Sequence, residues 1–313
     1  MRLFVGVTDW NWWSLHAGKP RVEEVNFWRP SATATFHALR PGELFLFKLH
    51  SPRNAIAGGG FFTRFVPLPV SLAWEAFGEA NGARSLEEVR SRISFYRRTP
   101  IAATEDPNIG CILLEEPFFF AEKDWIPTPS DFSLNVVVGK GYDTGSETGQ
   151  LLWQQVSQRL QAIRILSQDA GPALTAAADA ARFGSPTVVL PRLGQGSFRV
   201  LIIEAYTRRC AVTGERTLPV LEAAHIRPYA RGGPHELSNG LLLRSDLHTL
   251  FDRGYLGIDP KEQRVLISSR IKEEFENGKD YYSLHGRSIT PPVDEAAVPA
   301  FENLLYHAEN VFR

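Results

Sequence analysis

Histidine, asparagine and aspartate residues recur at short, fixed intervals in one segment of the C-terminal half of the chain. Asn239 follows His225 by fourteen residues, and His248 follows Asn239 by nine. His248 and Asp252 are four residues apart, so on a helix both would project from one face, where an imidazole and a carboxylate can bind the same divalent cation. Hydrolysis of a phosphodiester bond requires a base and such a cation, and this segment can supply both.

A hairpin followed by a short helix is expected to position these residues. The pattern predicts a strand that ends at His225, a turn-rich loop around residues 232–234, a second strand over 239–243, and a helix capped by Ser245. A helical stretch over residues 197–206 is predicted to precede them. The expected arrangement is therefore a ββα unit.

Residues 193–258 resemble the HNH (ββα-metal) endonuclease family, in the branch found in modification-dependent restriction endonucleases. The resemblance rests on Cys210, on the Thr213-Gly214 pair, on the run Leu221-Glu-Ala-Ala-His225-Ile-Arg-Pro228, on Gly232-Gly233, on Asn239-Gly-Leu-Leu-Leu243, and on Asp246, His248 and Asp252. It implies that His225 is the general base, that Asn239 orients the hairpin and the base through bonds to the backbone, and that His248 is catalytic and binds the metal with Asp252.

Other interpretations remain open for four of these residues. His225 can instead be a structural histidine with satisfied hydrogen bonds. Asn239 precedes a glycine, and Asn-Gly is also an ordinary turn signal. Asp252 can instead bond locally to the turn at residues 253–254, although the helix dipole disfavours a carboxylate there and a cation would compensate it. Asp246 lies in the first helical turn, where an acid is favoured without being a ligand.

The sequence departs from the wider HNH family at two positions. The residue before the base is often an aspartate or histidine that binds the metal, but here it is Ala224, which leaves the third ligand unknown. The Cys-x-x-Cys pairs of many relatives are reduced to Cys210, so no structural zinc is expected. Mg²⁺ is the expected ion, with Mn²⁺, Ni²⁺ or Co²⁺ as alternatives.

Composition and charge favour a globular protein that contacts DNA only locally. The chain has 313 residues and a formal net charge of -1, which argues against coating of DNA by the whole surface. Residues 186–258 contain nine arginines and six acidic residues, a net charge of +3. Two distant cysteines and the lack of a long apolar run predict a cytoplasmic protein without a membrane span; a homodimer is left open.

The N-terminal part is expected to be an α+β domain. Residues 44–49, 109–114 and 134–138 have the character of short strands. Helices are expected at 71–78 and from Ser85, where Ser85 and Glu88 form a capping box.

The length of the chain predicts two domains. A Gly- and Thr-rich stretch at 141–149 precedes a helix over 151–166 and an Ala-rich segment, and a short strand is expected at 187–190. The expected organisation is an N-terminal domain over 1–145, a helical linker over 146–185 and a nuclease domain over 186–313.

Aromatic residues are concentrated in the N-terminal part and can stack against a base taken out of a DNA duplex. The candidates for such a site are Trp10, Trp12, Trp13, Trp28 and Phe62. Packing in a hydrophobic core is the alternative for each of them.

The runs at residues 42–48, 58–62 and 109–114 are similar to PUA-like modules, which include EVE, ASCH and SRA readers of modified bases. That similarity implies a mixed β-barrel, and with the HNH resemblance it implies a phage-defence enzyme that cuts double-stranded DNA near a modified base, expected to be a modified cytosine. The alternatives are an HNH nuclease without modified-base recognition and a DNA-binding module with a decayed site.

Overall fold

The computed structural model describes residues 1–133, 135–166, 193–228 and 231–313, and it divides into two compact units, Met1–Arg192 and Leu193–Arg313. The expected strand at 187–190 and most of the Ala-rich part of the expected linker lie outside the described residues. The domain limits expected from the sequence stay a prediction. No helix in the described part combines the length and apolar character needed to cross a bilayer.

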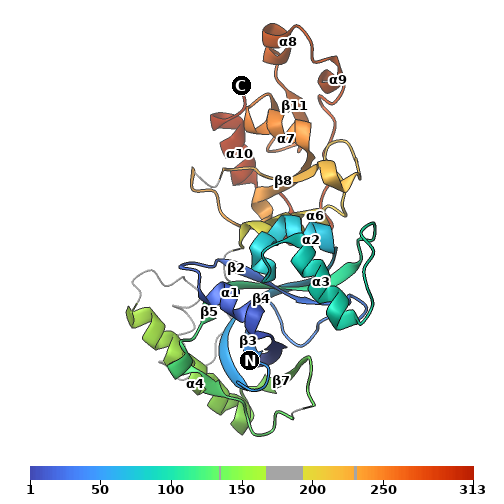
Figure 1. The fold of residues 1–313 in the computed structure, drawn as a ribbon. Coiled ribbons are helices and arrows are strands. Elements are labelled where there is room, and N and C mark those ends of the chain that lie inside the picture. Colours follow the sequence, from blue (N-terminus) through green and yellow to red (C-terminus); the bar gives the residue numbers. More distant parts are fainter. Residues whose placement is uncertain (134, 167–192, 229–230) are drawn as a thin grey trace. The chain divides into compact units, whose positions relative to one another are not determined.

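The N-terminal unit is built on a seven-stranded sheet (Figure 1). Its strands run in the order β2-β5-β4-β3-β1-β7, and β6 pairs with β4 beside this path. Only β1 and β3 are parallel; the other pairs are antiparallel. The strands are β1 (Arg2–Thr8), β2 (Glu24–Arg29), β3 (Leu44–Leu49), β4 (Ala55–Pro69), β5 (Asn108–Phe119), β6 (Ile126–Pro127) and β7 (Gly139–Asp143). Because β2 and β7 end the path unpaired with each other, the described strands form no closed barrel, and the expected mixed barrel is not confirmed.

Each face of this sheet carries its own hydrophobic core, because successive side chains of a strand point to opposite faces. Leu44 and Leu46 of β3 lie in one core, while Phe45 and Phe47 lie in the other. A strand covered on both faces has no polar alternation, which explains why β3 reads as a continuous apolar run.

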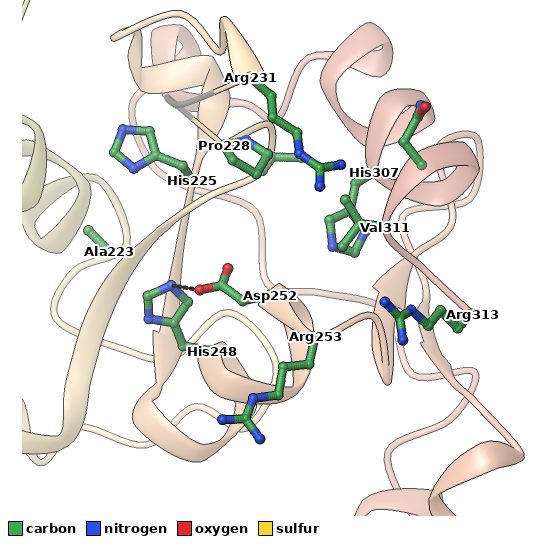
Figure 2. A pocket seen from close by; sticks show the side chains of 12 residues that line it. Ala223, His225, Pro228, Arg231, His248, Asp252, Arg253, His307, Val311 and Arg313 are labelled. Carbon is green, nitrogen blue, oxygen red and sulfur yellow. Dashed lines mark ion pairs between the residues drawn. The ribbon is translucent and has the colours of Figure 1, made fainter.

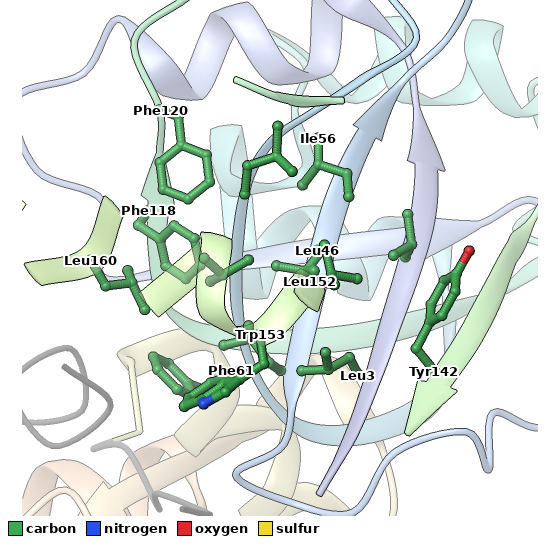
Figure 3. Packing of buried hydrophobic residues seen from close by; sticks show 14 of the residues in the cluster. Leu3, Leu46, Ile56, Phe61, Phe118, Phe120, Tyr142, Leu152, Trp153 and Leu160 are labelled. Atoms are coloured by element: carbon green, nitrogen blue, oxygen red, sulfur yellow. The ribbon is translucent and has the colours of Figure 1, made fainter. Parts of the chain in front are cut away.

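Helices cover the two cores. On one side the helix α4 (Glu147–Leu166) contributes Leu152, Trp153 and Leu160, which pack against strand residues such as Leu3 (Figure 3). On the other side α1 (Trp10–Ala17) contributes two tryptophans. The unit also contains α2 (Val70–Phe77), α3 (Leu86–Arg97) and the short 3-10 helices η1 (Gly78–Asn81) and η2 (Glu122–Asp124).

Most local predictions for this unit are confirmed. Both expected helices form, and the Ser85 side chain accepts a hydrogen bond from the Glu88 backbone N–H as the cap of α3. The strand expected over 134–138 is wrong for 135–138, which form turns and bends, while residue 134 lies outside the described residues. The strand begins instead at Gly139, where a side chain would collide with the Val5 carbonyl and the Phe4 ring, so only glycine permits this close approach to β1.

The C-terminal unit contains the predicted ββα arrangement. Strands β8 (Leu221–His225) and β9 (Gly240–Arg244) form an antiparallel pair with His225 opposite Gly240, and α7 (Ser245–Asp252) follows β9 directly. The helix α6 (Gln195–Ala205) confirms the helical stretch expected before the hairpin. Ser245 is the first residue of α7 rather than its cap, and the helix has no side-chain cap.

The remaining elements of this unit lie around the ββα arrangement. They are β10 (Leu256–Ile258), β11 (Val265–Ile267), α8 (Arg270–Phe275), α9 (Lys279–Tyr282), α10 (Phe301–Asn310) and the 3-10 helices η3 (Leu218–Val220), η5 (Leu237–Asn239) and η6 (Glu295–Ala297). Strands β10 and β11 pair as a second hairpin.

Burial of His16 in α1 should make the N-terminal unit sensitive to acid. Its ring packs against Trp12 and Phe119, neither ring nitrogen has a hydrogen-bond partner among the described residues, and burial, aided by Lys19, lowers its pKa to about 3. Because the unfolded chain takes up a proton near pH 6.5 and the folded chain does not, stability falls as the pH falls from 6.5 towards 3. The free energy of unfolding should therefore be about 2 kcal/mol lower at pH 5 than at pH 7.

We expect His16→Phe to remove this part of the acid sensitivity. All seven tryptophans of the chain lie in the N-terminal unit, so urea unfolding followed by tryptophan fluorescence at pH 7 and pH 5 measures it. His37→Phe, at an exposed histidine, is the control and should lose as much stability as the wild type. Equal losses in wild type and His16→Phe would contradict the prediction.

Candidate active site

The β8–β9 hairpin is held by the side chain of Asn239, which is fully buried. Its Oδ1 accepts a hydrogen bond from the Arg227 N–H at 2.8 Å, and its Nδ2 donates to the carbonyls of Arg227 at 3.0 Å and Pro234 at 2.9 Å. These three bonds connect the two ends of the loop that follows His225. All three partners are backbone groups, and the orienting role of Asn239 stays a prediction.

The glycine after Asn239 does not form the turn that an Asn-Gly pair often indicates. Gly240 has an extended backbone and begins β9. A side chain here would lie 2.4 Å from Ile202 and 2.9 Å from Phe198, both on α6. The glycine therefore allows α6 to pack closely against the hairpin.

His225 is stacked on this helix. Its ring lies parallel to that of Phe198, with 4.0 Å between the ring centroids, and the ring of His235 lies 5.4 Å away. Burial, with smaller effects from His235 and His248, lowers the pKa of His225 to about 4. Its imidazole is therefore neutral at neutral pH, and its buried Nε2 has no hydrogen-bond partner among the described residues.

His248 and Asp252 lie on one face of α7, as their spacing predicts. Figure 2 shows the two side chains facing each other, and Nε2 of His248 lies 3.4 Å from Oδ2 of Asp252. The turn after the helix is closed by main-chain bonds, including Gly254 N–H to the Phe251 carbonyl. The Asp252 carboxylate thus lies beside His248, as a shared cation would require.

The electrostatics around Asp252 favour a cation. Burial raises the pKa of Asp252, and the charge of Glu222 raises it further, while His248 opposes both effects. The carboxylate also ends a helix, where the dipole disfavours negative charge. Imidazole nitrogen and carboxylate oxygen are ligands for divalent metals, so this pair fits such an ion, although no group of three metal-binding side chains is present among the described residues.

A pocket of about 560 Å³ joins these residues to parts of the chain that sequence reasoning did not identify; we call it the nuclease pocket (Figure 2). His225, His248 and Asp252 line it together with Arg231 and Arg253. The C-terminal part of the unit also lines it, through His307, Asn310, Val311 and Arg313. These last residues lie about fifty positions beyond the motif, and no periodicity or spacing in the sequence connects them to it.

Asp246 and Cys210 have structural contacts. Arg244 donates two hydrogen bonds to the Asp246 carboxylate, at 2.6 and 2.8 Å, and this arginine lowers the pKa of Asp246. The Cys210 sulfur is buried and accepts a hydrogen bond from the Arg244 N–H at 3.4 Å. Asp246 is therefore engaged by an arginine rather than directed at His248.

The sequence of this unit matches a known family. Residues 210–259 match the HNH endonuclease family. The matched segment contains His225, Asn239, His248 and Asp252, and it supports a general activity as a DNA nuclease. HNH nucleases generally depend on a divalent metal ion. None of the curated proteins matches the chain.

Three of the five candidate base-binding aromatics, Trp12, Trp13 and Phe62, are buried together in a core of the N-terminal unit. Trp10 is partly exposed, but its ring stacks on Trp13 and carries the Arg53 guanidinium 3.8 Å from its centroid.

Trp12 and Trp28 line a second pocket of about 520 Å³, which we call the aromatic pocket. Asp9, His50 and Tyr96 also line it, together with Val137 and Val138. Tyr96 donates a hydrogen bond to Asp9 at 3.3 Å, and its ring lies edge-on to Trp28 at 6.2 Å. The sequence did not point to Tyr96, because the apolar spacing of α3 identifies only the buried face of the helix, and Tyr96 does not lie on that face.

Replacing Asn239 should loosen the hairpin that carries His225. In Asn239→Ala the partly buried Arg227 N–H and two carbonyls lose their partners, and a fully buried unsatisfied group costs about 1–3 kcal/mol, which is an upper bound for each of them. We expect faster hydrogen exchange at the Arg227 amide and a lower melting temperature of the C-terminal unit, measured by mass spectrometry and circular dichroism.

Asn310→Ala is the matched control for this substitution. Asn310 is exposed and donates one hydrogen bond to the Tyr306 carbonyl, so its loss should change stability by less than about 0.5 kcal/mol. Unchanged protection of the Arg227 amide in Asn239→Ala would show that Asn239 does not hold the loop.

Proposed function

We propose that the protein is a modification-dependent DNA restriction endonuclease that hydrolyses phosphodiester bonds near a modified base, expected to be a modified cytosine. The observation that carries the proposal is the nuclease pocket, in which a neutral imidazole lies beside an imidazole–carboxylate pair within the segment that matches HNH endonucleases. The aromatic pocket of the N-terminal unit supports the recognition step.

His225 acts as the general base. A base must be unprotonated before the reaction, and burial of this imidazole holds it in the neutral form at physiological pH. Stacking on Phe198 fixes the plane of the ring, and the bonds of Asn239 fix the strand end that carries it. The imidazole accepts a proton from the attacking water.

His248 and Asp252 would hold a divalent ion, with Mg²⁺ expected and Mn²⁺, Ni²⁺ or Co²⁺ as alternatives. Such an ion, when bound, stabilises charge on the phosphate and on the leaving oxygen. The two residues supply one nitrogen and one oxygen ligand from consecutive turns of α7. A hard ion such as Mg²⁺ keeps several water ligands, so two protein ligands leave room for the DNA phosphate.

The arginines of the nuclease pocket would bind the DNA backbone. Arg231, Arg253 and Arg313 line the pocket from three different parts of the unit. Guanidinium groups match phosphate oxygens through paired hydrogen bonds. This local positive charge can hold DNA although the whole chain is nearly neutral.

In the aromatic pocket Trp28 is the first candidate for stacking on a flipped base. Its indole N–H donates to the Asn81 carbonyl at 2.8 Å, so the ring is fixed in orientation while it remains partly accessible. Taking a base out of the duplex costs a few kcal/mol, and stacking on an aromatic ring returns about 1–3 kcal/mol per base. Asp9 and His50 supply polar groups that can bind the edge of the base.

A DNA-binding module with a decayed catalytic site is a second candidate, because Ala224 occupies the position where many relatives carry a metal ligand. The two functions differ in cleavage. A decayed module would bind DNA and leave every plasmid intact in the presence of Mg²⁺ or Mn²⁺.

Substitutions should separate the base from the metal ligand. His225→Ala should reduce cleavage of modified plasmid by at least about 100-fold, the usual lower contribution of a general base, while Mn²⁺ binding by calorimetry stays at the wild-type level. His248→Ala should lose both cleavage and Mn²⁺ binding, because it removes the nitrogen ligand, and Asp252→Asn should weaken Mn²⁺ binding. Cleavage by His225→Ala at the wild-type rate would refute the assignment of the base.

Trp28→Ala should remove the preference for modified DNA. Binding of the full chain to matched duplexes, with and without one modified cytosine, is measured at one salt concentration, because phosphate contacts depend strongly on salt. We expect wild type to prefer the modified duplex and Trp28→Ala to lose about 10-fold in affinity for it only, since stacking contributes about 1–3 kcal/mol.

The control for this experiment is Phe95→Ala. Phe95 is an exposed aromatic residue beside Tyr96 that does not line the aromatic pocket. Its removal should leave both affinities unchanged. Equal affinity of the wild type for the two duplexes would favour an HNH nuclease without modified-base recognition.

A further inference from the structure

Glu222 of β8 contacts the imidazole of His248, which belongs to a different element. Its Oε2 lies 2.6 Å from Nδ1 of the ring, while Asp252 lies on the side of Nε2 at 3.4 Å. A carboxylate accepts hydrogen bonds and does not donate them, so Nδ1 must carry the proton of this bond. In the neutral form of the ring, the other nitrogen, Nε2, then keeps its lone pair.

Glu222 lies at the wrong edge of the ring to share an ion with Asp252. The two nitrogens of an imidazole point away from each other, and each is matched here with a different carboxylate. An ion held by Nε2 and Asp252 is therefore out of reach of Glu222 in this arrangement. This geometry also agrees with the finding of no three-ligand group among the described residues.

The strand explains why Glu222 reaches α7. Side chains alternate along a strand, so Glu222 and Ala224 share one face of β8. Ala224 is fully buried and carries no ligand atom. Glu222 thus lies two residues before position 224, where many HNH relatives carry a metal ligand.

We propose that Glu222 is a positioning residue that holds His248 in its Nδ1–H form and so directs Nε2 towards the metal, an inference that rests on the proposed metal-dependent nuclease. In metal proteins a histidine ligand generally donates its second N–H to such a partner, which fixes the orientation of the ring. Glu222 would take this role at a site where position 224 is an alanine and supplies no ligand atom.

Stability alone does not account for the contact. About half of the Glu222 side chain is exposed to solvent, and exposed ion pairs contribute between about 0 and 1 kcal/mol. Glu222→Ala should therefore fold with nearly the wild-type melting temperature. Its effect should be concentrated on His248 and on metal binding.

The first test reads the ring directly and needs neither metal nor DNA. Long-range ¹H–¹⁵N correlation spectra of the histidine rings are recorded on the full chain, and the His248 signals are assigned by their loss in His248→Ala. We expect the Nδ1–H form of His248 in wild type and a shift towards the Nε2–H form in Glu222→Ala. An unchanged His248 ring in Glu222→Ala overturns the proposal.

The second test measures Mn²⁺ affinity by calorimetry on wild type, Glu222→Ala and Glu222→Gln. Loss of the partner of a metal-binding histidine typically weakens metal binding by about 10–100-fold, and we expect this for Glu222→Ala. Glu222→Gln retains an oxygen that accepts the Nδ1 proton and should recover most of the affinity. Equal losses in both variants would make Glu222 a charged ligand of the ion and overturn the positioning role.

The control is Glu204→Ala on α6, which removes a partly exposed acid that pairs with Arg208 in the same unit. Its Mn²⁺ affinity should equal that of the wild type. If wild type neither binds Mn²⁺ nor cleaves DNA, the proposed function fails, whereas the ring spectra still decide whether Glu222 sets the form of His248. If wild type does both and Glu222→Ala equals it, only the positioning role fails.

Discussion

Asn239 connects the two ends of the loop between β8 and β9, and the geometry of the nuclease pocket depends on this connection. A single buried amide satisfies one N–H and two carbonyls of this loop, at Arg227 and Pro234. The loop ends are thereby fixed to the hairpin, so His225 stands opposite Gly240. Because α7 follows β9 without an intervening loop, the same register also determines where His248 and Asp252 lie.

The three candidate residues of the nuclease pocket, His225, His248 and Asp252, differ in how far they are buried. His225 is enclosed by Phe198 and His235, which favours the neutral form of its ring. His248 and Asp252 lie at a partly open wall of the same pocket, where water and a phosphate can complete the coordination of an ion. In the proposed mechanism, the proton acceptor and the cation site therefore share one pocket, while only the proton acceptor is enclosed by buried neighbours.

The sequence predicted the ββα unit well because its signals are local. The i, i+4 spacing of His248 and Asp252 and the strand that ends at His225 depend only on neighbouring residues, and both are present in the structure. The contributions of His307 and Arg313 to the pocket arise from tertiary packing and left no comparable pattern. Glu222 could have been found, since strand alternation puts it on the same face as Ala224.

In the N-terminal unit local reasoning located most helices and strands, but it failed for the segment before β7 and for the surroundings of the aromatic residues. The run at 136–138 has high β propensity, yet Val137 and Val138 are exposed and line the aromatic pocket, while pairing with β1 is made by the glycine-containing stretch that follows. Likewise, composition identified the aromatic residues but not their surroundings, because a core covered on both faces of a sheet and a stacking pocket use the same residue types.

Ala224 alone does not decide whether the nuclease site is active. A third protein ligand is required only if the ion must be held tightly before DNA arrives, and a phosphate with its water ligands can complete the coordination of Mg²⁺. When only two protein side chains bind the ion, their orientation matters more, because each misdirected ligand removes a larger share of the free energy of metal binding. The 2.6 Å contact between Glu222 and His248 would fix such an orientation from the same strand that carries Ala224.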